Sequence, residues 1–206
     1  HVHYEMLIST IPLQNLYALQ DKKSQHVEEL LHGLKYMNII FVYLFIKKPK
    51  ISNDHWIYFT DQDIVFNRAV EFGNWSPFMC PAGTTSVCFD ITTFKNLKDI
   101  DDAQVASSVI EDACRIGYIK KDDIISHLVV HVDHAYPFYD LDYKSKLDAI
   151  VRFFESDSLS LLGRTGIFRY NNSDNSIEMG FELAEQFLKS KQHATVHNYQ
   201  IQNASL

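Results

Sequence analysis

A strand, a glycine-containing turn and a helix follow one another near the carboxyl end of this chain of 206 residues. Leu159–Leu162 is a short apolar run of the kind that forms a buried strand, and Gly163-Arg164-x-Gly166 after it has the composition of a turn. A helix is predicted to begin near Asp174. Such a unit needs other strands beside it. It therefore constrains the fold to an α/β arrangement in which this helix starts at the carboxyl edge of a sheet.

The amino end of that helix is a candidate site for negative charge. Its free N–H groups and its dipole, equivalent to about half a positive charge, favour a phosphate or a developing anion. Ser173 or Asp174 is the predicted N-cap, and Arg164 adds a planar, permanently charged set of donors suited to a pyrophosphate. The alternative interpretation is a well-capped helix after a purely structural turn, and the spacing alone favours neither.

Strand-like and helix-like segments alternate along the rest of the chain. Tyr4–Ser9 is predicted as a buried strand that leads into a helix beginning at Pro12. Residues 61–85 combine proline, glycine and aromatic residues, which predicts an ordered loop region. Apolar spacing predicts further strands at Tyr36–Ile46, His55–Phe59, Thr84–Ile91 and Ile124–Val132, and helices at Asp101–Ile116 and Lys144–Phe154.

This order of elements predicts a discontinuous architecture of the α/β (α+β) class. Residues 1–20 and 156–192 would contribute to one parallel sheet, whose other strands lie before His1. Residues 21–155 would form a separate domain with helices around an antiparallel or mixed sheet. Residues 193–206 are polar and would form a frayed tail.

Composition excludes several classes of protein. The 26 acidic and 19 basic side chains leave a formal net charge of −7, the wrong sign for a nucleic-acid-binding surface. The longest apolar run, Ile39–Ile46, is far shorter than the roughly 20 residues that a membrane-spanning helix needs. The 3 cysteines are odd in number and form no C-x-x-C pair, which favours a reducing cytoplasm over a disulfide framework or a zinc site. Nothing in the sequence indicates an oligomeric state.

Other groups of reactive residues give weaker signals. His127, His131 and His134 would share one face of a helix, but the local sequence is strand-like, so we expect no three-ligand metal site. Two acidic pairs have the spacing of acid–base catalysts but the surroundings of solvated loops, which we favour: Asp61 with Asp63 and Asp140 with Asp142. A G-x-S-x-G nucleophile motif is absent from the sequence.

Four blocks of the sequence resemble a known family. The segment Gly163–Ile177, GRTGIFRYNNSDNSI, resembles the closing FAD-binding motif of the amine-oxidase superfamily of flavoproteins. Within that superfamily, the segment most resembles those of UDP-galactopyranose mutases and of protoporphyrinogen oxidase-like oxidoreductases. Three further blocks are similar to that family in the same order: Leu7–Pro12, Phe66–Glu71, and Tyr136-Pro137 with Asp140. The resemblance implies an antiparallel-sheet substrate domain plus the terminal strand and helix of a Rossmann-like FAD/NAD(P)-binding domain.

The resemblance also implies roles for residues of the closing motif. Arg164, between Gly163 and Gly166, would lie near the cofactor and the substrate diphosphate. Asn172 matches an aspartate that contacts the ribityl chain of FAD, and the amides around Ser173 and Asp174 would face the flavin's pyrimidine edge. A helix amino terminus stabilises the negative charge that a reduced flavin carries there.

Three residues are implied at the substrate. Arg68 matches an arginine close to the flavin and the sugar, and it is the candidate catalytic residue. Tyr136 and Tyr170 match tyrosines that hydrogen-bond substrate phosphates. Their alternative roles are a surface arginine and two half-buried core tyrosines.

Departures from the family pattern shape the functional hypothesis. Glu71–Trp75 lacks the histidine that the mutases carry after the loop arginine, and Asn172-Ser173-Asp174 replaces their Asp-Met-Asp. None of the 7 glycines forms G-x-G-x-x-G, the main FAD cradle. We therefore expect the carboxyl-terminal portion of a longer flavoenzyme, which by itself would bind FAD weakly or not at all and be inactive.

The predicted activity of the full-length enzyme is that of a mutase acting on a nucleotide sugar in lipopolysaccharide or other polysaccharide synthesis. The first alternative is an FAD-dependent oxidoreductase acting on an unknown small molecule. The second alternative is a non-enzymatic binding module. The sequence does not name the substrate.

Overall fold

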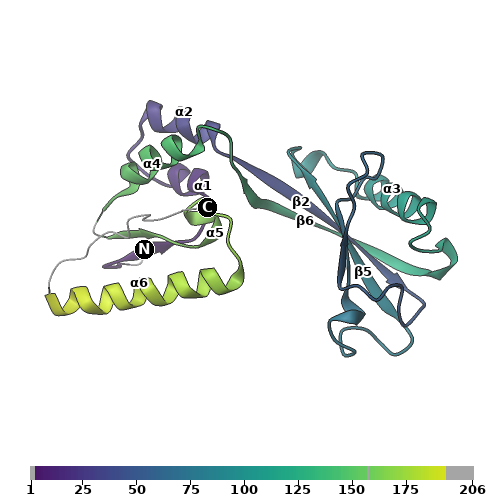
Figure 1. The fold of residues 1–206 in the computed structure, drawn as a ribbon. Helices are drawn as coiled ribbons and strands as arrows, with labels where there is room; N and C mark the ends of the chain where they lie inside the picture. The colour runs from purple at the N-terminus through teal and green to yellow at the C-terminus, as the bar shows by residue number, and fades with distance from the viewer. Residues whose placement is uncertain (1–2, 157, 194–206) are drawn as a thin grey trace. The chain divides into compact units, whose positions relative to one another are not determined.

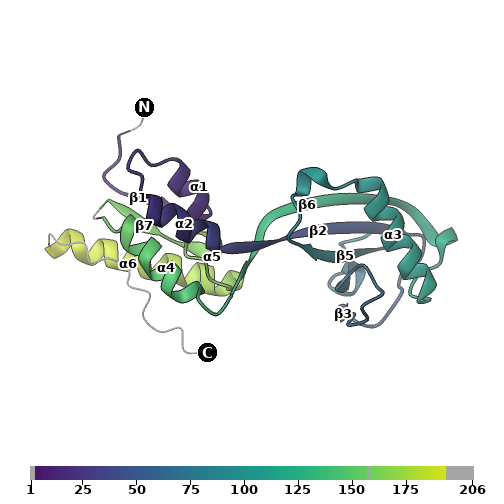
Figure 2. The same cartoon turned by 90° about the horizontal axis from the view of Figure 1, so that it is seen from above.

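A computed structural model of the chain describes residues 3–156 and 158–193, with side chains through Lys189. It consists of two compact units (Figures 1 and 2). Of the described residues, unit 1 comprises 3–36, 136–156 and 158–193, and unit 2 comprises 37–135. The chain passes between the units within two long strands, β2 (Lys35–Ile46) and β6 (Ile124–Phe138).

Unit 1 contains a small parallel sheet built from segments far apart in the sequence. Strand β1 (Leu7–Ser9) pairs with β7 (Leu159–Leu161), so that Leu7 stands opposite Leu159. This pairing confirms the prediction that the first and last strands of the chain share one parallel sheet. The helices of the unit are α1 (Leu13–Ala18), α2 (Gln25–Gly33), α4 (Tyr143–Phe154), α5 (Gly163–Gly166) and α6 (Ser173–His193).

The core of unit 1 is formed mainly by helices α1, α2 and α4. Their apolar faces form one core together with Phe168, which is fully buried. Phe168 lies in the segment that joins α5 to α6. Burial of these side chains supplies most of the stability of such a unit. The buried residues are Leu13, Leu16, Tyr17, Val27, Leu31, Leu34, Tyr36, Leu147, Ile150, Phe154 and Phe168.

Unit 2 is a five-stranded sheet with one helix packed on it. The strand order is β3-β4-β5-β2-β6, with β3 (Trp56–Tyr58), β4 (Arg68–Glu71) and β5 (Thr85–Thr93). The pairs β3–β4, β4–β5 and β5–β2 are antiparallel. Helix α3 (Asp102–Arg115) lies over one face of this sheet (Figure 2). The predicted class of fold, an antiparallel sheet with helices together with a parallel strand pair, is confirmed.

Alternation along the strands separates the two faces of this sheet. Side chains of β2 and β5 that face α3 are apolar and buried, because successive residues of a strand point to opposite faces. The central buried residues are Ile40, Val42, Leu44, Val87, Phe89, Val109 and Ala113. The opposite face carries polar and aromatic side chains, including Tyr43, Arg68, Cys88 and Asp90.

Three local predictions are corrected by the structure. Strand β4 lies inside residues 61–85, which were predicted as a loop; Ala69 is fully buried there, opposite Phe89. Helix α2 was not predicted, because only Val27 and Leu31 of its residues are buried. Helix α6 begins at Ser173, so Ser173 and Asp174 lie in its first turn rather than at the predicted N-cap.

The contact-based boundaries of the units fall at residues 36/37 and 135/136. They place α2 and α4 in the same unit as the parallel strands, whereas the sequence assigned residues 21–155 to one domain. The division into cofactor and substrate domains stays a prediction. Of the predicted tail 193–206, residues 194–206 lie outside the described part of the chain.

Candidate cofactor and substrate site

The glycines of the closing motif shape the turn that follows β7. Gly163 has a φ of +76°, a backbone conformation that favours glycine. A Cβ at Gly166 would lie 2.7 Å from the carbonyl oxygen of Ser9, so only glycine allows this close approach. The hydroxyl of Thr165 donates to the carbonyl of Thr10 at 2.7 Å. These contacts hold the short helix α5 against the end of β1.

Arg164 projects from this turn toward two tyrosine rings. Its Cζ lies 4.8 Å from the ring centroid of Tyr136 and 4.7 Å from that of Tyr170. The two rings are stacked on each other with centroids 5.5 Å apart and an interplanar angle of 29°. Contact with aromatic faces is favourable for a guanidinium and does not consume its in-plane N–H donors. The structure thus brings Tyr136 together with Arg164 and Tyr170, which belong to a different block of the sequence.

The backbone that carries Tyr170 is held by residues that sequence reasoning missed. The hydroxyl of Tyr139 accepts a hydrogen bond of 2.6 Å from the backbone N–H of Tyr170. Burial raises the pKa of the Tyr139 hydroxyl. Phe168, two residues before Tyr170, has a φ of 52° although it is a bulky residue. Such a conformation is strained, and here the buried ring of Phe168 against Tyr36 compensates for it.

A cavity of about 460 Å³ opens at the amino end of α6. Three of the predicted cofactor residues, Arg164, Asn172 and Ser173, line it together with Asn171 and Ser176. The free N–H groups of the first turn give this end of the helix a partial positive charge. Asp174 and the two glycines of the motif do not line the cavity.

Asn171 is the buried polar residue of this cavity. It is 6% exposed, and its Nδ2 donates to the sulfur of Met179 at 3.4 Å. Its Oδ1 is buried and accepts no hydrogen bond from the described residues. A buried acceptor without a donor is unfavourable, so the atom is suited to receive an N–H or O–H group from a bound molecule.

Arg68, the predicted catalytic residue, belongs to unit 2. Its Nε donates to Oδ2 of Asp90 at 2.9 Å, and its Nη2 donates to the same oxygen. Its guanidinium also lies over the ring of Tyr58, with 5.8 Å from Cζ to the ring centroid. Asp90 is 5% exposed; burial raises the pKa of its carboxyl, and the charge of Arg68 opposes that rise.

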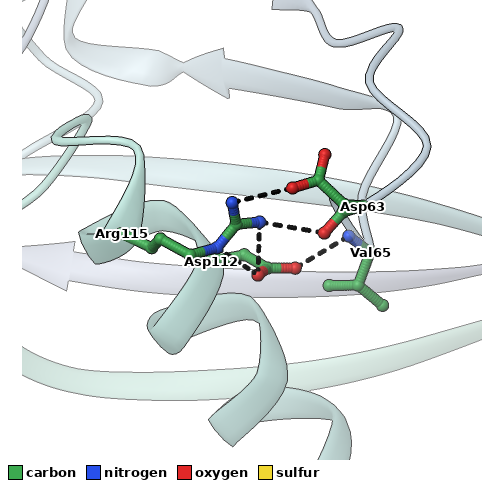
Figure 3. A network of polar contacts seen from close by, with 4 residues as sticks. All are labelled: Asp63, Val65, Asp112 and Arg115. Atoms are coloured by element: carbon green, nitrogen blue, oxygen red, sulfur yellow. Dashed lines mark hydrogen bonds and ion pairs between the residues drawn. The ribbon is translucent and has the colours of Figure 1, made fainter.

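A polar network attaches the segment before β4 to the end of α3 (Figure 3). Arg115 donates to the carboxylate and to the carbonyl oxygen of Asp63, both at 2.9 Å. It also donates to Asp112, whose other oxygen accepts from the backbone N–H of Val65 at 2.9 Å. Asp63 therefore serves to hold the loop that leads into Arg68, in line with the loop interpretation of the Asp61 and Asp63 pair.

The other groups singled out in the sequence form local contacts. His127, His131 and His134 lie on strand β6, and Nε2 of His131 is 2.8 Å from Asp102. Among residues 3–156 and 158–193, no group of three or more His, Cys, Asp or Glu could hold a metal ion. Asp140 pairs with Lys146 at 2.6 Å, and this hydrogen bond lowers the pKa of its carboxyl. In the described part of the chain, no helix is long and apolar enough to cross a membrane.

Three contributing residues had no usable signal in the sequence. Tyr139 lies close to the quoted Tyr-Pro block, but its contact with Tyr170 joins segments 31 residues apart. Asn171 is adjacent to a predicted residue, yet its burial depends on the packing of α6. Asp90 meets Arg68 because β4 pairs with β5, and a strand order is not written in a local pattern.

A parallel strand pair formed from both ends of the chain, with an antiparallel sheet inserted between them, defines the class of fold. No family model matches the chain. Its structure is similar to that of a reduced UDP-galactopyranose mutase, with a TM-score of 0.79 and 19% identity, covering 99% of this chain and 44% of that one. It is also similar to a protein from Exiguobacterium sp. 255-15 provisionally assigned as a protoporphyrinogen oxidase, with a TM-score of 0.68 and 11% identity, covering 92% of this chain and 41% of that one.

The chain thus has the fold of the matching part of these two proteins and spans less than half the length of each. They are the two kinds of protein that the sequence blocks resemble. The fold implied by that resemblance is therefore confirmed.

Proposed function

We propose that the chain is part of an FAD-dependent flavoenzyme that acts on a nucleotide sugar in the manner of a UDP-galactopyranose mutase. The observation that carries this proposal is the placement of Arg164 against Tyr136 and Tyr170, beside the amino end of α6. A planar cation, hydroxyl donors and backbone N–H groups are all suited to binding the oxygens of a diphosphate. These groups meet in unit 1 although Tyr136 comes from a different segment of the chain than the others.

The residues at the α6 cavity fit part of an FAD molecule. FAD carries phosphate oxygens, ribityl hydroxyls and ring N–H groups. Arg164 and the amides of Ser173 are suited to negative charge, and the buried Oδ1 of Asn171 is suited to a hydroxyl or N–H donor. Asn172 would contact the ribityl chain as a neutral amide. When bound, FAD would supply either hydride acceptance or, in its reduced form, nucleophilic attack on the sugar.

The chain's own residues would bind, orient and compensate charge. Arg164 would neutralise the substrate diphosphate while Tyr136 and Tyr170 donate their hydroxyl hydrogens to phosphate oxygens. The first turn of α6 would stabilise negative charge on the cofactor. Arg68 would contact the sugar or the flavin.

An FAD-dependent oxidoreductase is the second candidate function. Two observations favour it: the similarity to the Exiguobacterium protein and the absence of the mutases' histidine after Arg68. The segment Phe72–Asn74 there forms a 3₁₀ turn. In this case the diphosphate site would serve the cofactor alone, and the substrate would be a small molecule.

The test uses the native full-length protein, purified with its flavin and reduced. We expect interconversion of UDP-galactopyranose and UDP-galactofuranose, with a loss of about a hundredfold in kcat/KM on Arg164→Ala. Arg169→Ala, which removes an exposed arginine of the same turn, is the matched control and should retain activity. Bound, reduced FAD without turnover would reject the mutase and leave the oxidoreductase. A full-length protein that neither carries nor takes up flavin would indicate a non-enzymatic binding module. A role in lipopolysaccharide synthesis rests on the mutase outcome.

A further inference from the structure

The sheet of unit 2 lines up four side chains across four strands. Tyr58 of β3 stands opposite Arg68 of β4, Arg68 stands opposite Asp90 of β5, and Asp90 stands opposite Phe41 of β2. Directly opposed residues point to the same face of a sheet. That face is the one turned away from α3, so Arg68 and Asp90 share it with the aromatic rings of Tyr58 and Phe41.

The carboxylate of Asp90 fixes the plane of the guanidinium. Nε and Nη2 of Arg68 both donate to Oδ2, which directs two of the five N–H donors to one side. The other oxygen, Oδ1, lies 3.8 Å from the sulfur of Cys88. The ring of Tyr58 supports the guanidinium from its face. Three neighbouring strands thus restrain one arginine.

The two side chains of this pair differ in their exposure to solvent. The side chain of Asp90 is 6% exposed, whereas that of Arg68 is 28% exposed. The nearby thiol of Cys88 and hydroxyl of Tyr43 carry no charge at pH 7, and burial raises the pKa of each to about 12. Arg68 is therefore the cation that compensates Asp90, and turning it away would leave a buried charge.

Glu71, the other buried carboxylate of the unit, has a different set of partners. It is 1% exposed and accepts from the backbone N–H groups of Ile51 and Ser52 at 2.8 and 2.9 Å and from the hydroxyl of Thr85 at 3.2 Å. These bonds attach a loop to the sheet. Asp90 instead holds a partly exposed cation on the face away from the helix, which is an arrangement suited to a binding site.

We propose that Asp90 is a positioning residue, which fixes the orientation in which the guanidinium of Arg68 meets the substrate. The inference rests on the proposed function, in which Arg68 contacts the sugar or the flavin. Asp90 itself would not touch the substrate. Its effect on binding would pass through Arg68 alone.

A double-mutant cycle in the native full-length protein tests this, with the dissociation constant and kcat/KM for UDP-galactopyranose as readouts. We expect Asp90→Asn to weaken binding about tenfold and Arg68→Gln to weaken it at least as much. In the Arg68→Gln background, Asp90→Asn should have no further effect. Asp123→Asn is the matched control, because Asp123 pairs with Lys48 in the same unit at 2.5 Å.

Asp90→Glu, which retains the charge, is expected to fall between the wild type and Asp90→Asn, and it provides the test if Asp90→Asn does not fold. An effect of Asp90→Asn that persists in the Arg68→Gln background would overturn the inference, as would a loss in Asp90→Glu as large as that in Asp90→Asn. Normal binding by Arg68→Gln would reject the proposed role of Arg68 and the inference with it. Impaired Arg68→Gln beside normal Asp90→Asn would reject the inference alone.

Discussion

The two candidate arginines are held by opposite means. Arg164 in unit 1 lies against the faces of Tyr136 and Tyr170, whereas Arg68 in unit 2 is bound in its plane by the buried Asp90. Face contacts are worth about 0.5–2 kcal/mol and do not use N–H donors. An in-plane pair with a buried carboxylate fixes the direction in which the guanidinium points. Breaking such a pair leaves the buried carboxylate without its cation.

This difference indicates two tasks. An arginine held by its faces can turn within the plane of its guanidinium, because stacking on an aromatic ring does not fix that angle. Its N–H donors can therefore be directed to either phosphate of a diphosphate ligand. An arginine held by its edge presents the same donors in one direction only. The following four predictions test this comparison.

The largest effect is expected from Arg68→Ala. It would leave Asp90 buried without its cation, and we expect a loss of about 3–5 kcal/mol in the free energy of unfolding. Arg115→Ala removes a cation from a solvent-exposed network and should lower the free energy of unfolding far less. Urea unfolding of the chain followed by tryptophan fluorescence measures both, because the 2 tryptophans, Trp56 and Trp75, lie in unit 2. Equal losses would contradict the distinction.

Gly166→Ala tests the turn that carries Arg164. The new Cβ would lie 2.7 Å from the carbonyl oxygen of Ser9 and 3.1 Å from Cα of Thr10, so the turn must move, at a cost of about 1–3 kcal/mol. Gly180→Ala is the control, since a Cβ there meets nothing within 4 Å and should stabilise α6 by about 0.5–1 kcal/mol. Thermal unfolding by circular dichroism should show the two changes with opposite signs. A neutral Gly166→Ala would argue against tight packing of α5 on β1.

Tyr139→Phe tests the support of Tyr170. It removes the hydroxyl that accepts from the backbone N–H of Tyr170, with an expected cost of about 1 kcal/mol. The amide of Tyr170 should exchange its hydrogen faster, which NMR resolves residue by residue. Tyr143→Phe is the control, because its ring packs on Tyr139 with centroids 4.4 Å apart while its hydroxyl has no hydrogen bond to the described residues. Unchanged exchange in Tyr139→Phe would show that the loop is held by Phe168 instead.

The smallest effect concerns the thiol beside Asp90. Burial and the neighbouring carboxylate raise the pKa of Cys88 to about 12, so in the folded protein it stays a thiol at pH values where a free cysteine is a thiolate. Iodoacetamide should therefore label the partly exposed Cys80 before Cys88 at pH 9, as mass spectrometry would show. In urea the two should react alike. Early labelling of Cys88 in the folded chain would mean that the polar face around Arg68 is open.

Much of this fold was predictable because long elements carry regular patterns. Strand β2 is rich in β-branched and aromatic residues, and α3 places Val109 and Ala113 on one face. Strand β4 was missed because it has only four residues, of which the first and the last are charged. Helix α2 was missed because two buried residues make too narrow an apolar stripe.

The candidate site was predictable only in part. The resemblance selected Arg164, Tyr136 and Tyr170, but neither periodicity nor spacing could place Tyr136 in contact with the closing motif that carries the other two. Asp90 and Tyr139 escaped prediction for the same reason, since both act through contacts between segments distant in the sequence. Local patterns specify elements, whereas sites are produced by pairing and packing among them.

The pairing of β1 with β7 has a consequence for synthesis on the ribosome. Strand β1 emerges from the ribosome before unit 2, residues 37–135, whereas its partner β7 emerges only after unit 2. We expect unit 2 to fold first. Because β2 and β6 are neighbours in its sheet, folding brings residues 37 and 135 toward each other. The loop that β1 and β7 must close is then shorter, so the nascent antiparallel sheet lowers the entropy cost of completing the parallel one.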